Sequence, residues 1–356
     1  MNEWNRNSPG NLPEIWQDKN FSQDRWNERR KQIINILCEE AYGFLPPAPK
    51  KTEWTICETD NEFCAGKAPL KKVLLNITLT NNNLFTLPVN AVIPANVKNA
   101  PFFVYISFSP NVPDKFLPCE EIIDSGFGIL SFFYEDAASD NADFSSGLPA
   151  ALGLNDNSSC GKIAVWAWAA LRVMDYAYSL AELDKNRAAV AGHSRLGKTA
   201  LLAGALDTRF KYIISNNSGC CGAALSRSKK GETIRNITDA FPYWFKSGFN
   251  KFADNEDKLP FDQHFLIAAS APRNVYVSSA EDDTWADPNS EFIGCKNAGG
   301  IWTKLGYQGL VVDDNKPVTG KLYHAGEVAY HVRSGGHYLG REDWRNFMKY
   351  INKPER

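Results

Sequence analysis

The second half of the chain alternates apolar runs of strand length with apolar runs of helix length, and this alternation constrains the fold most. We expect helices at 163–183, 198–206, 261–270 and 342–351, and strands at 187–191, 212–215, 275–279 and 326–332. The expected strands are almost continuously apolar, which is typical of strands buried on both faces of a mostly parallel sheet. The pattern therefore predicts an α/β protein, a three-layer α/β/α sandwich around a mostly parallel central sheet.

The first half of the chain predicts an antiparallel portion that precedes this parallel part. Residues 22–42 have apolar side chains at helical spacing, ended by Gly43 and Pro46. Short β-rich runs follow at 73–80, 85–93 (interrupted by a proline), 102–108 and 128–134. We expect one domain over residues 1–356, with residues 1–20 as an extended N-terminal segment.

Composition excludes several classes of protein. The 356 residues carry a net charge of −2, so the chain lacks the basic field of a nucleic-acid or membrane-surface protein. Its longest uncharged apolar run, residues 163–171, is too short to span a bilayer. The eight cysteines are scattered without metal-ligand spacing, so we expect no metal site and at most one or two disulfides. Residues 1–6 lack the apolar core of a leader, which fits a cytoplasmic chain or a mature exported one.

The stretch AGHSRLGK (191–198) joins an expected strand to an expected helix and carries a serine at the turn. Gly192 and Gly197 give room for a sharp corner that lifts the Ser194 side chain above the sheet, where open α/β sheets bind ligands. A helix starting near Gly197 directs free N–H groups at developing negative charge. Ser194 is therefore a candidate nucleophile on an α/β-hydrolase fold. The pattern is one residue longer than the common Gly-x-Ser-x-Gly elbow, and a serine that only caps the helix is the alternative.

A nucleophilic serine needs a base. In the chain order of an α/β-hydrolase triad, the base lies on a loop after the last strand. His337 lies in a glycine-rich loop between the last expected strand and the terminal helix, and is our candidate. His193 adjoins the serine but should point away from it, and His264 lies in an apolar helical run. His324 and His331 lie in or beside the last β-rich stretch, where structural histidines are common.

The third member of a triad orients the imidazole and usually follows the penultimate strand. The expected strand 275–279 runs into a segment with four carboxylates in seven residues, 281–287. Such a cluster is also typical of a solvated turn. We choose Asp283 as the acid, with Asp282 and Asp287 as alternatives.

Longer blocks around these residues resemble a known enzyme family. The segments GHSRLGKTALLAGALDTRFKYIISNNSGCCGAALSR, GETIRNITDAFPYWF, LPFDQHFLIAASAPRNVYVSSAEDDTWADPNSEF and SGGHYLGREDW resemble the glucuronoyl esterases of carbohydrate esterase family 15, especially the bacterial branch. The resemblance covers roughly residues 20–350. It implies an α/β-hydrolase, without a cofactor, that cleaves the ester between 4-O-methyl-D-glucuronic acid on xylan and a lignin alcohol in lignocellulose.

Matched residue by residue, the resemblance implies Ser194 as nucleophile, His337 as base, and Arg195 as the cation that stabilises the oxyanion. A cation beside the start of a helix is unfavourable because it opposes the helix dipole, so an arginine at position 195 suggests a function. The alternative for Arg195 is an ordinary surface residue at a helix start.

The resemblance also implies that Lys198, Glu232 and Trp285 hold the sugar, through hydrogen bonds to hydroxyls and contact of the indole with the ring. The alternatives are a solvated helix lysine, an ordinary loop acid and a core tryptophan. The implied partner is glucuronoxylan or a lignin-carbohydrate ester, with no nucleic acid and no membrane. We expect a monomer that is secreted or periplasmic.

Two positions depart from the fungal members of the family. Where those carry the acidic triad residue this chain has Asn217, which strengthens Asp283 as the acid. Where they carry a disulfide-bonded cysteine before the serine it has His193, so that bridge is absent, although Cys295 could pair with Cys220 or Cys221. The alternatives for function are another carbohydrate esterase, acetyl or feruloyl, and a non-catalytic glucuronoxylan-binding relative.

Overall fold

The computed structural model describes residues 12–227 and 230–354. One ten-stranded sheet runs through the described residues in the order β1-β2-β3-β5-β4-β6-β7-β8-β10-β9. Its strands are β1 (Lys51–Asp60), β2 (Leu70–Thr78), β3 (Leu84–Val92), β4 (Ala100–Ser107), β5 (Gly128–Phe133), β6 (Leu183–His193), β7 (Tyr212–Asn216), β8 (Asn274–Ala280), β9 (Leu322–Tyr323) and β10 (Val328–Arg333).

The α-helices are α1 (Gln23–Leu37), α2 (Cys119–Asp124), α3 (Tyr134–Ala137), α4 (Gly147–Leu152), α5 (Lys162–Ser179), α6 (Arg195–Leu206), α7 (Ile234–Ala240), α8 (Gln263–Ala268), α9 (Pro288–Lys304) and α10 (Arg341–Ile351). A π-helical turn, η2 (Cys38–Tyr42), continues α1. Short 3₁₀ turns are η3 (Phe63–Gly66), η4 (Pro242–Trp244), η5 (Phe249–Phe252) and η6 (Glu256–Lys258).

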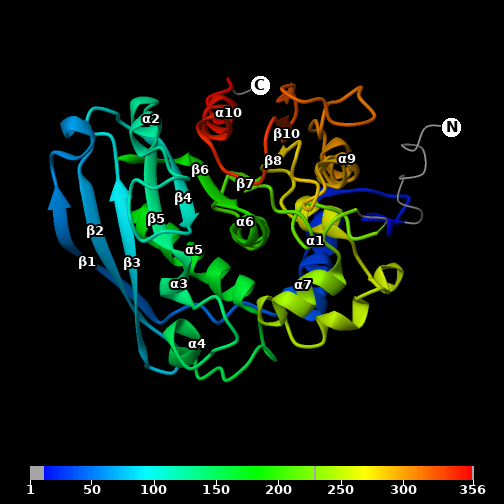
Figure 1. Ribbon diagram of the computed structural model, residues 1–356, viewed down its shortest axis with the longest axis horizontal. Helices are drawn as coiled ribbons and strands as arrows, with labels where there is room; N and C mark the ends of the chain where they lie inside the picture. The colour runs from blue at the N-terminus through cyan, green and yellow to red at the C-terminus, as the bar shows by residue number, and fades with distance from the viewer. Residues whose placement is uncertain (1–11, 228–229, 355–356) are drawn as a thin grey trace.

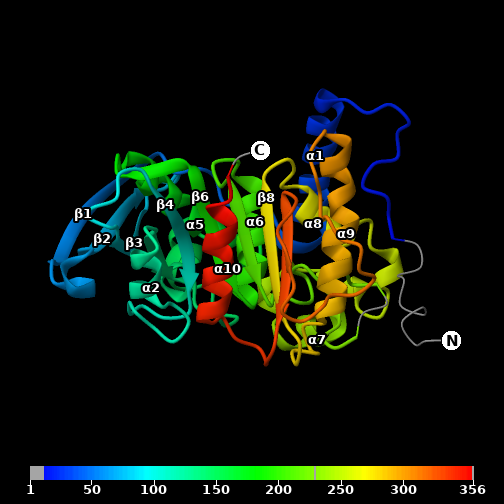
Figure 2. The same ribbon diagram turned by 90° about the horizontal axis from the view of Figure 1, so that it is seen from above.

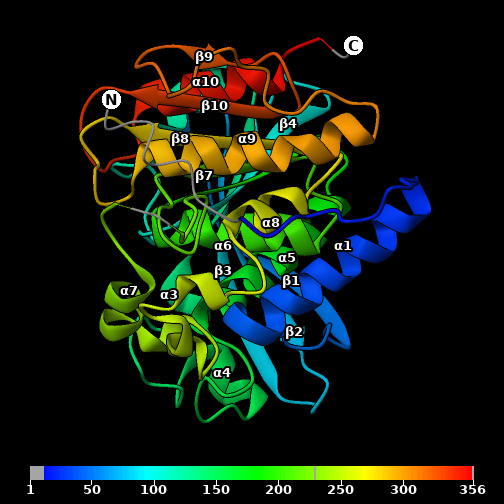
Figure 3. The same cartoon turned by 90° about the vertical axis from the view of Figure 1, so that its right-hand side faces the viewer.

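Helices cover both faces of the sheet, so the predicted three-layer α/β fold is confirmed (Figures 1 and 3). The larger core lies between the sheet and α1, α5, α6, α8 and α9. A smaller core lies under α2 and α10, and Figure 2 shows α10 lying along the strands on that face. In β6, Ala188 and Val190 belong to the larger core while Ala189 and Ala191 belong to the smaller one, which explains the unbroken apolar run.

The sheet is parallel from β5 through β4, β6, β7 and β8 to β10, and antiparallel at β1, β2 and β3. The predicted antiparallel portion is confirmed for β2 and β3, whereas the runs expected at 102–108 and 128–134 form β4 and β5, which belong to the parallel part. The proline of the third strand, Pro88, does not interrupt it. β5 pairs only with residues 90–92 of β3, so the missing N–H of Pro88 falls where β3 has a single neighbour.

Several boundaries were predicted wrongly. The helix expected at 163–183 ends at Ser179, because Leu183 already begins β6. β1 and α9 were not predicted. The side chains of β1 are nearly all exposed and lack an apolar alternation, and α9 contains Gly294, Gly299 and Gly300.

Of the expected extended segment 1–20, residues 1–11 lie outside the described residues, and residues 12–20 contain neither helix nor strand. The eight cysteines, all within the described part of the chain, are free, so the one or two disulfides that the sequence allowed are not formed, and Cys295 pairs with neither Cys220 nor Cys221. Cys220 and Cys221 are buried neighbours with their Sγ atoms 3.7 Å apart. Among the described helices, none combines the length and apolarity needed to cross a bilayer.

Candidate active site

Ser194 stands at the corner between β6 and α6 in a strained backbone conformation, with φ 58° and ψ −126°. A Cβ on Gly192 would lie 2.0 Å from the carbonyl oxygen of Leu196, so only glycine permits the turn to close. α6 begins at Arg195, earlier than predicted, so the helix N-terminus directly follows the serine. In the described structure the Ser194 side chain makes no capping hydrogen bond to α6, which removes the helix-cap alternative.

His337 and Asp283 come from loops after the neighbouring parallel strands β10 and β8. His337 Nδ1 lies 2.6 Å from Asp283 Oδ2. The same carboxylate oxygen accepts a hydrogen bond from Asn217 Nδ2 at 2.7 Å, and the backbone N–H of Ala286 reaches Oδ1 at 3.3 Å. Burial alone would raise the pKa of Asp283, but the hydrogen bonds from His337 and Asn217 outweigh it, so the pKa is below its ordinary value.

His193 connects this pair to the corner. It directly precedes Ser194, and its ring centroid lies 4.6 Å from that of His337. The loop after β10 therefore reaches the β6–α6 corner. His193 is buried and its Nδ1 lies 2.6 Å from Asn216 Oδ1. Burial and the neighbouring His337 lower the pKa of His193 to about 3, so its ring stays neutral beside the site.

The other candidate histidines and acids lie in different environments. Asp287 caps α9, accepting from Ser290 N at 3.1 Å, and Asp282 is exposed. His331 Nε2 lies 3.0 Å from Asp343, and both His324 and His331 contact the hydroxyl of Tyr276. His264 is buried, with Nε2 3.0 Å from the carbonyl oxygen of Pro13. Of the histidines and acids weighed, His337 and Asp283 are the pair that the structure brings together.

Arg195 points into a cluster of aromatic rings instead of into solvent. Its guanidinium carbon lies 4.7 Å from the ring centroid of Trp244 and 5.5 Å from that of Phe241. The guanidinium also forms an ion pair with Asp140, while the side chain stays 27% exposed. Arg195 is therefore not an ordinary surface residue, and a ligand can still reach it. Asp140 was missed in the sequence because it lies 55 positions away with no recognisable motif.

Lys198, Glu232 and Trp285 lie close together. Lys198 Nζ, buried, donates to the carbonyl oxygen of Ser218 and lies 4.0 Å from Glu232 Oε2. The backbone N–H of Glu232 donates to the carbonyl oxygen of Trp285 at 3.0 Å. Lys198 is thus not a solvated helix lysine, and Trp285, 55% exposed, is not a core residue.

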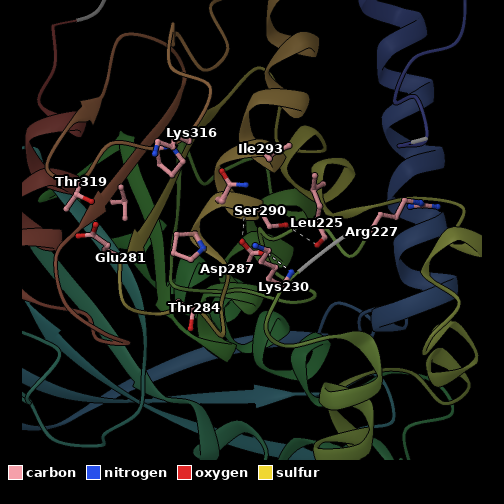
Figure 4. Close-up of a pocket in the computed structure, with 14 residues that line it drawn as sticks. Leu225, Arg227, Lys230, Glu281, Thr284, Asp287, Ser290, Ile293, Lys316 and Thr319 are labelled. Carbon is pink, nitrogen blue, oxygen red and sulfur yellow. Dashed lines mark hydrogen bonds between the residues drawn. The ribbon is translucent and has the colours of Figure 1, made fainter. Parts of the chain in front are cut away.

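A pocket of about 400 Å³ adjoins the loop that carries Asp283 and Trp285 (Figure 4). Its lining includes Glu281, Thr284 and Asp287 from that loop and the first turn of α9. Neither Ser194, His337 nor Asp283 is among its described lining residues. The pocket is therefore a neighbour of the candidate site and not its location.

Known proteins resemble this chain in sequence and in fold. The family model for fungal glucuronyl esterases matches residues 77–306. A carbohydrate esterase, MZ0003, from an unknown prokaryotic organism is 34% identical over 93% of this chain and 85% of its own length. A 4-O-methyl-glucuronoyl methylesterase of Schizophyllum commune is 30% identical over 82% of this chain and 70% of its own. The solved glucuronoyl esterase of Solibacter usitatus superposes with a TM-score of 0.85, at 31% identity, over 96% of this chain and 97% of that one.

The fold is that of the α/β-hydrolases, and the relatives define the protein as a carboxylic ester hydrolase. The chain belongs to the glucuronoyl esterase family. The resemblance inferred from the motifs around Ser194 and His337 is thereby confirmed.

Proposed function

We propose that this protein is a serine esterase that hydrolyses the ester between 4-O-methyl-D-glucuronic acid groups of glucuronoxylan and lignin alcohols. The names of its relatives support the substrate class. The observation that carries the chemistry is the His337–Asp283 pair beside the strained Ser194 corner. Ser194, His337 and Asp283 act as nucleophile, base and orienting acid.

In the proposed reaction, His337 takes the proton from Ser194 Oγ as that oxygen attacks the ester carbonyl carbon. Asp283, bonded to Nδ1, holds the imidazole and stabilises its charged form. The tetrahedral intermediate collapses with loss of the alcohol, which takes its proton from His337, and leaves a glucuronoyl ester on Ser194. A water molecule, deprotonated by His337, then attacks that ester, and His337 returns the proton to Ser194 Oγ as glucuronic acid leaves.

Arg195 stabilises the oxyanion of both tetrahedral intermediates together with backbone N–H groups at the start of α6. The ester carbonyl is neutral in the ground state, so a fixed cation there favours the transition state over the substrate. Removal of one such donor typically raises the barrier by about 3 to 4 kcal/mol.

Lys198 and Glu232 bind sugar hydroxyls, and the exposed indole of Trp285 covers the sugar. Their proximity supports this role, because a buried lysine beside a carboxylate presents one donor and one acceptor to adjacent hydroxyls. The polymeric substrate lies outside the cell, so we propose a secreted or periplasmic protein. We also propose that it acts as a monomeric, single catalytic domain.

The test compares hydrolysis of benzyl D-glucuronate with deacetylation of acetylated xylan and release of ferulate from feruloylated arabinoxylan. We expect rapid cleavage of the glucuronate ester. We expect kcat/KM on acetylated xylan and on feruloylated arabinoxylan to be at least about tenfold lower, which corresponds to an activation barrier about 1.4 kcal/mol higher. A preference for acetyl or feruloyl esters would replace the proposed substrate class. Binding of glucuronoxylan without cleavage of any ester would favour a non-catalytic relative.

A further inference from the structure

Asp140, in the loop after α3, is a carboxylate enclosed by hydrogen-bond donors from three separate elements. Its side chain is only 8% exposed. Oδ2 accepts from the Tyr134 hydroxyl at 2.9 Å and from Arg195 Nη1, and Oδ1 accepts from Trp244 Nε1 at 2.7 Å. These donors come from α3, α6 and η4. A buried charge with this many partners is held in one place.

The donors are suited to an ionised carboxylate. Burial, and then the charge of Asp140, raise the pKa of Tyr134, so its hydroxyl keeps its proton and donates. Trp244 has only a donor to offer, since its indole nitrogen carries a hydrogen and no free lone pair. Trp244 also packs its ring against the Arg195 guanidinium, 4.7 Å from its centroid. Trp244 therefore contacts both Asp140 and Arg195 and holds the two side chains in one arrangement.

Arg195 would be poorly placed without this partner. It is the first residue of α6, where the helix dipole is positive and repels a cation. Its Nε–H is buried with no hydrogen-bond partner among the described residues. Phe108, Phe241 and Trp244 offer the guanidinium ring faces but no carboxylate. Asp140 supplies the negative charge that makes this position favourable for Arg195.

We propose that Asp140 is a positioning residue for the esterase reaction, one that holds the Arg195 guanidinium where the oxyanion forms. This inference rests on the proposed function. A guanidinium has five N–H donors in a fixed plane, so a bond from Nη1 to Asp140 sets the direction of the others without using them. Asp140 contributes by fixing the donors before the charge develops, which is how such groups stabilise transition states.

The nearly isosteric variant Asp140→Asn tests this. A neutral amide has one acceptor oxygen and adds an N–H₂ donor, so it cannot accept from Arg195, Tyr134 and Trp244 together. We expect kcat on benzyl D-glucuronate to fall about 10- to 100-fold, the scale of a misplaced catalytic group, with KM changed less than about threefold. Asp140→Glu, which restores the charge, should recover part of the lost kcat.

The decisive measurement repeats Asp140→Asn in an Arg195→Ala background. If Asp140 acts through Arg195, Asp140→Asn lowers kcat by less than about twofold in the Arg195→Ala background. A merely structural role would lower kcat by the same factor in both backgrounds, and that result would overturn the inference. Thermal unfolding of all four proteins shows whether each is folded.

If Asp140→Asn does not fold, Trp244→Phe allows the same cycle, because it removes only the Nε1–H donor and keeps a ring against Arg195. We expect a smaller loss of kcat, about three- to tenfold, that also disappears without Arg195. Equal losses in both backgrounds would overturn the inference here too. A parent protein inactive on benzyl D-glucuronate would reject the proposed function itself. An active parent with an unimpaired Asp140→Asn would reject only the inference.

Discussion

Asp283 Oδ2 accepts hydrogen bonds from both His337 Nδ1 and Asn217 Nδ2, at 2.6 and 2.7 Å. Asn217, after β7, and Asp283, after β8, are therefore neighbours over adjacent strands. The resemblance to the fungal members implies that they place the triad acid at the position of Asn217. A carboxylate at either position would thus stand close to His337, and a change of acid between the two loops requires no change in the fold.

Asp283→Asn should lower kcat/KM on benzyl D-glucuronate on the order of 10³- to 10⁴-fold, because an amide neither holds the reactive imidazole tautomer nor stabilises the imidazolium. The thermal midpoint should change much less than the activity. Steady-state kinetics and a melting curve on the same sample measure both. An Asp283→Asn protein with near-parent activity would remove Asp283 from the triad.

The double variant Asn217→Glu/Asp283→Asn should recover at least about tenfold of the activity that Asp283→Asn loses, because the acid returns from the other loop. Asn217→Glu alone should impair the enzyme, since two carboxylates would then share one site. Asn217→Ala/Asp283→Asn is the matched control and should show no recovery. Equal activity in the two double variants would contradict the proposed exchange of acids.

Arg195→Ala should lower kcat about 10²- to 10³-fold with little change in KM, because the interaction is made mainly in the transition state. Arg195→Lys keeps the charge but loses the planar guanidinium, and should recover only part of the rate. The measurement is kcat and KM for both variants. A large rise in KM with unchanged kcat would instead make Arg195 a substrate-binding residue.

Gly192→Ala should inactivate the protein or lower its yield of folded material, because the new Cβ would lie 2.0 Å from the Leu196 carbonyl oxygen. Overpacking of this kind typically costs about 1 to 3 kcal/mol and distorts the surrounding backbone. Gly300→Ala in α9 is the control: its Cβ would meet nothing within 4 Å and should stabilise the helix by about 0.5 to 1 kcal/mol. The free energy of unfolding of each variant, compared with that of the parent, measures the constraint at the corner: it should fall for Gly192→Ala and rise for Gly300→Ala.

His193 makes the protein sensitive to acid. Its pKa is about 3 in the folded state against an ordinary 6.5, so between these pH values only the unfolded chain takes up this proton. The resulting loss of stability as pH falls is about 1.4 kcal/mol per pH unit for a fully titrating group. His193→Phe, less stable at pH 7 without the bond to Asn216, should close the gap to the parent as pH falls from 6.5 to 4. Denaturant unfolding at several pH values tests this, and parallel pH curves would contradict it.

The parallel part of the fold was predictable at β6, β7 and β8, because their apolar runs are buried on both faces, whereas β4 was placed in the antiparallel portion. β1 was not predictable in this way, since its conformation depends on pairing with β2 more than on burial of its own side chains. α9 was hidden by glycines that serve close packing: a Cβ on Gly294 would lie 2.5 Å from the Ala223 carbonyl oxygen.

The candidate site likewise contains residues that could be predicted from the sequence and residues that could not. Ser194, Asp283 and His337 follow β6, β8 and β10 in the chain order of an α/β-hydrolase triad. It could therefore be anticipated from strand order alone that their loops lie close together. The Asp140–Arg195 pair could not, because it depends on how the loop after α3 packs against α6 and η4. His193 was expected to point away from Ser194, but its contact with the His337 ring required the folded loop after β10.

The proposed triad is tested most directly by kcat for benzyl D-glucuronate in the parent, Ser194→Ala and His337→Ala proteins, each verified as folded by its melting curve. We expect steady turnover by the parent and a loss of at least about 10⁴-fold in both variants, because neither retains a nucleophile activated by a base. Turnover by Ser194→Ala within tenfold of the parent would contradict the proposed triad.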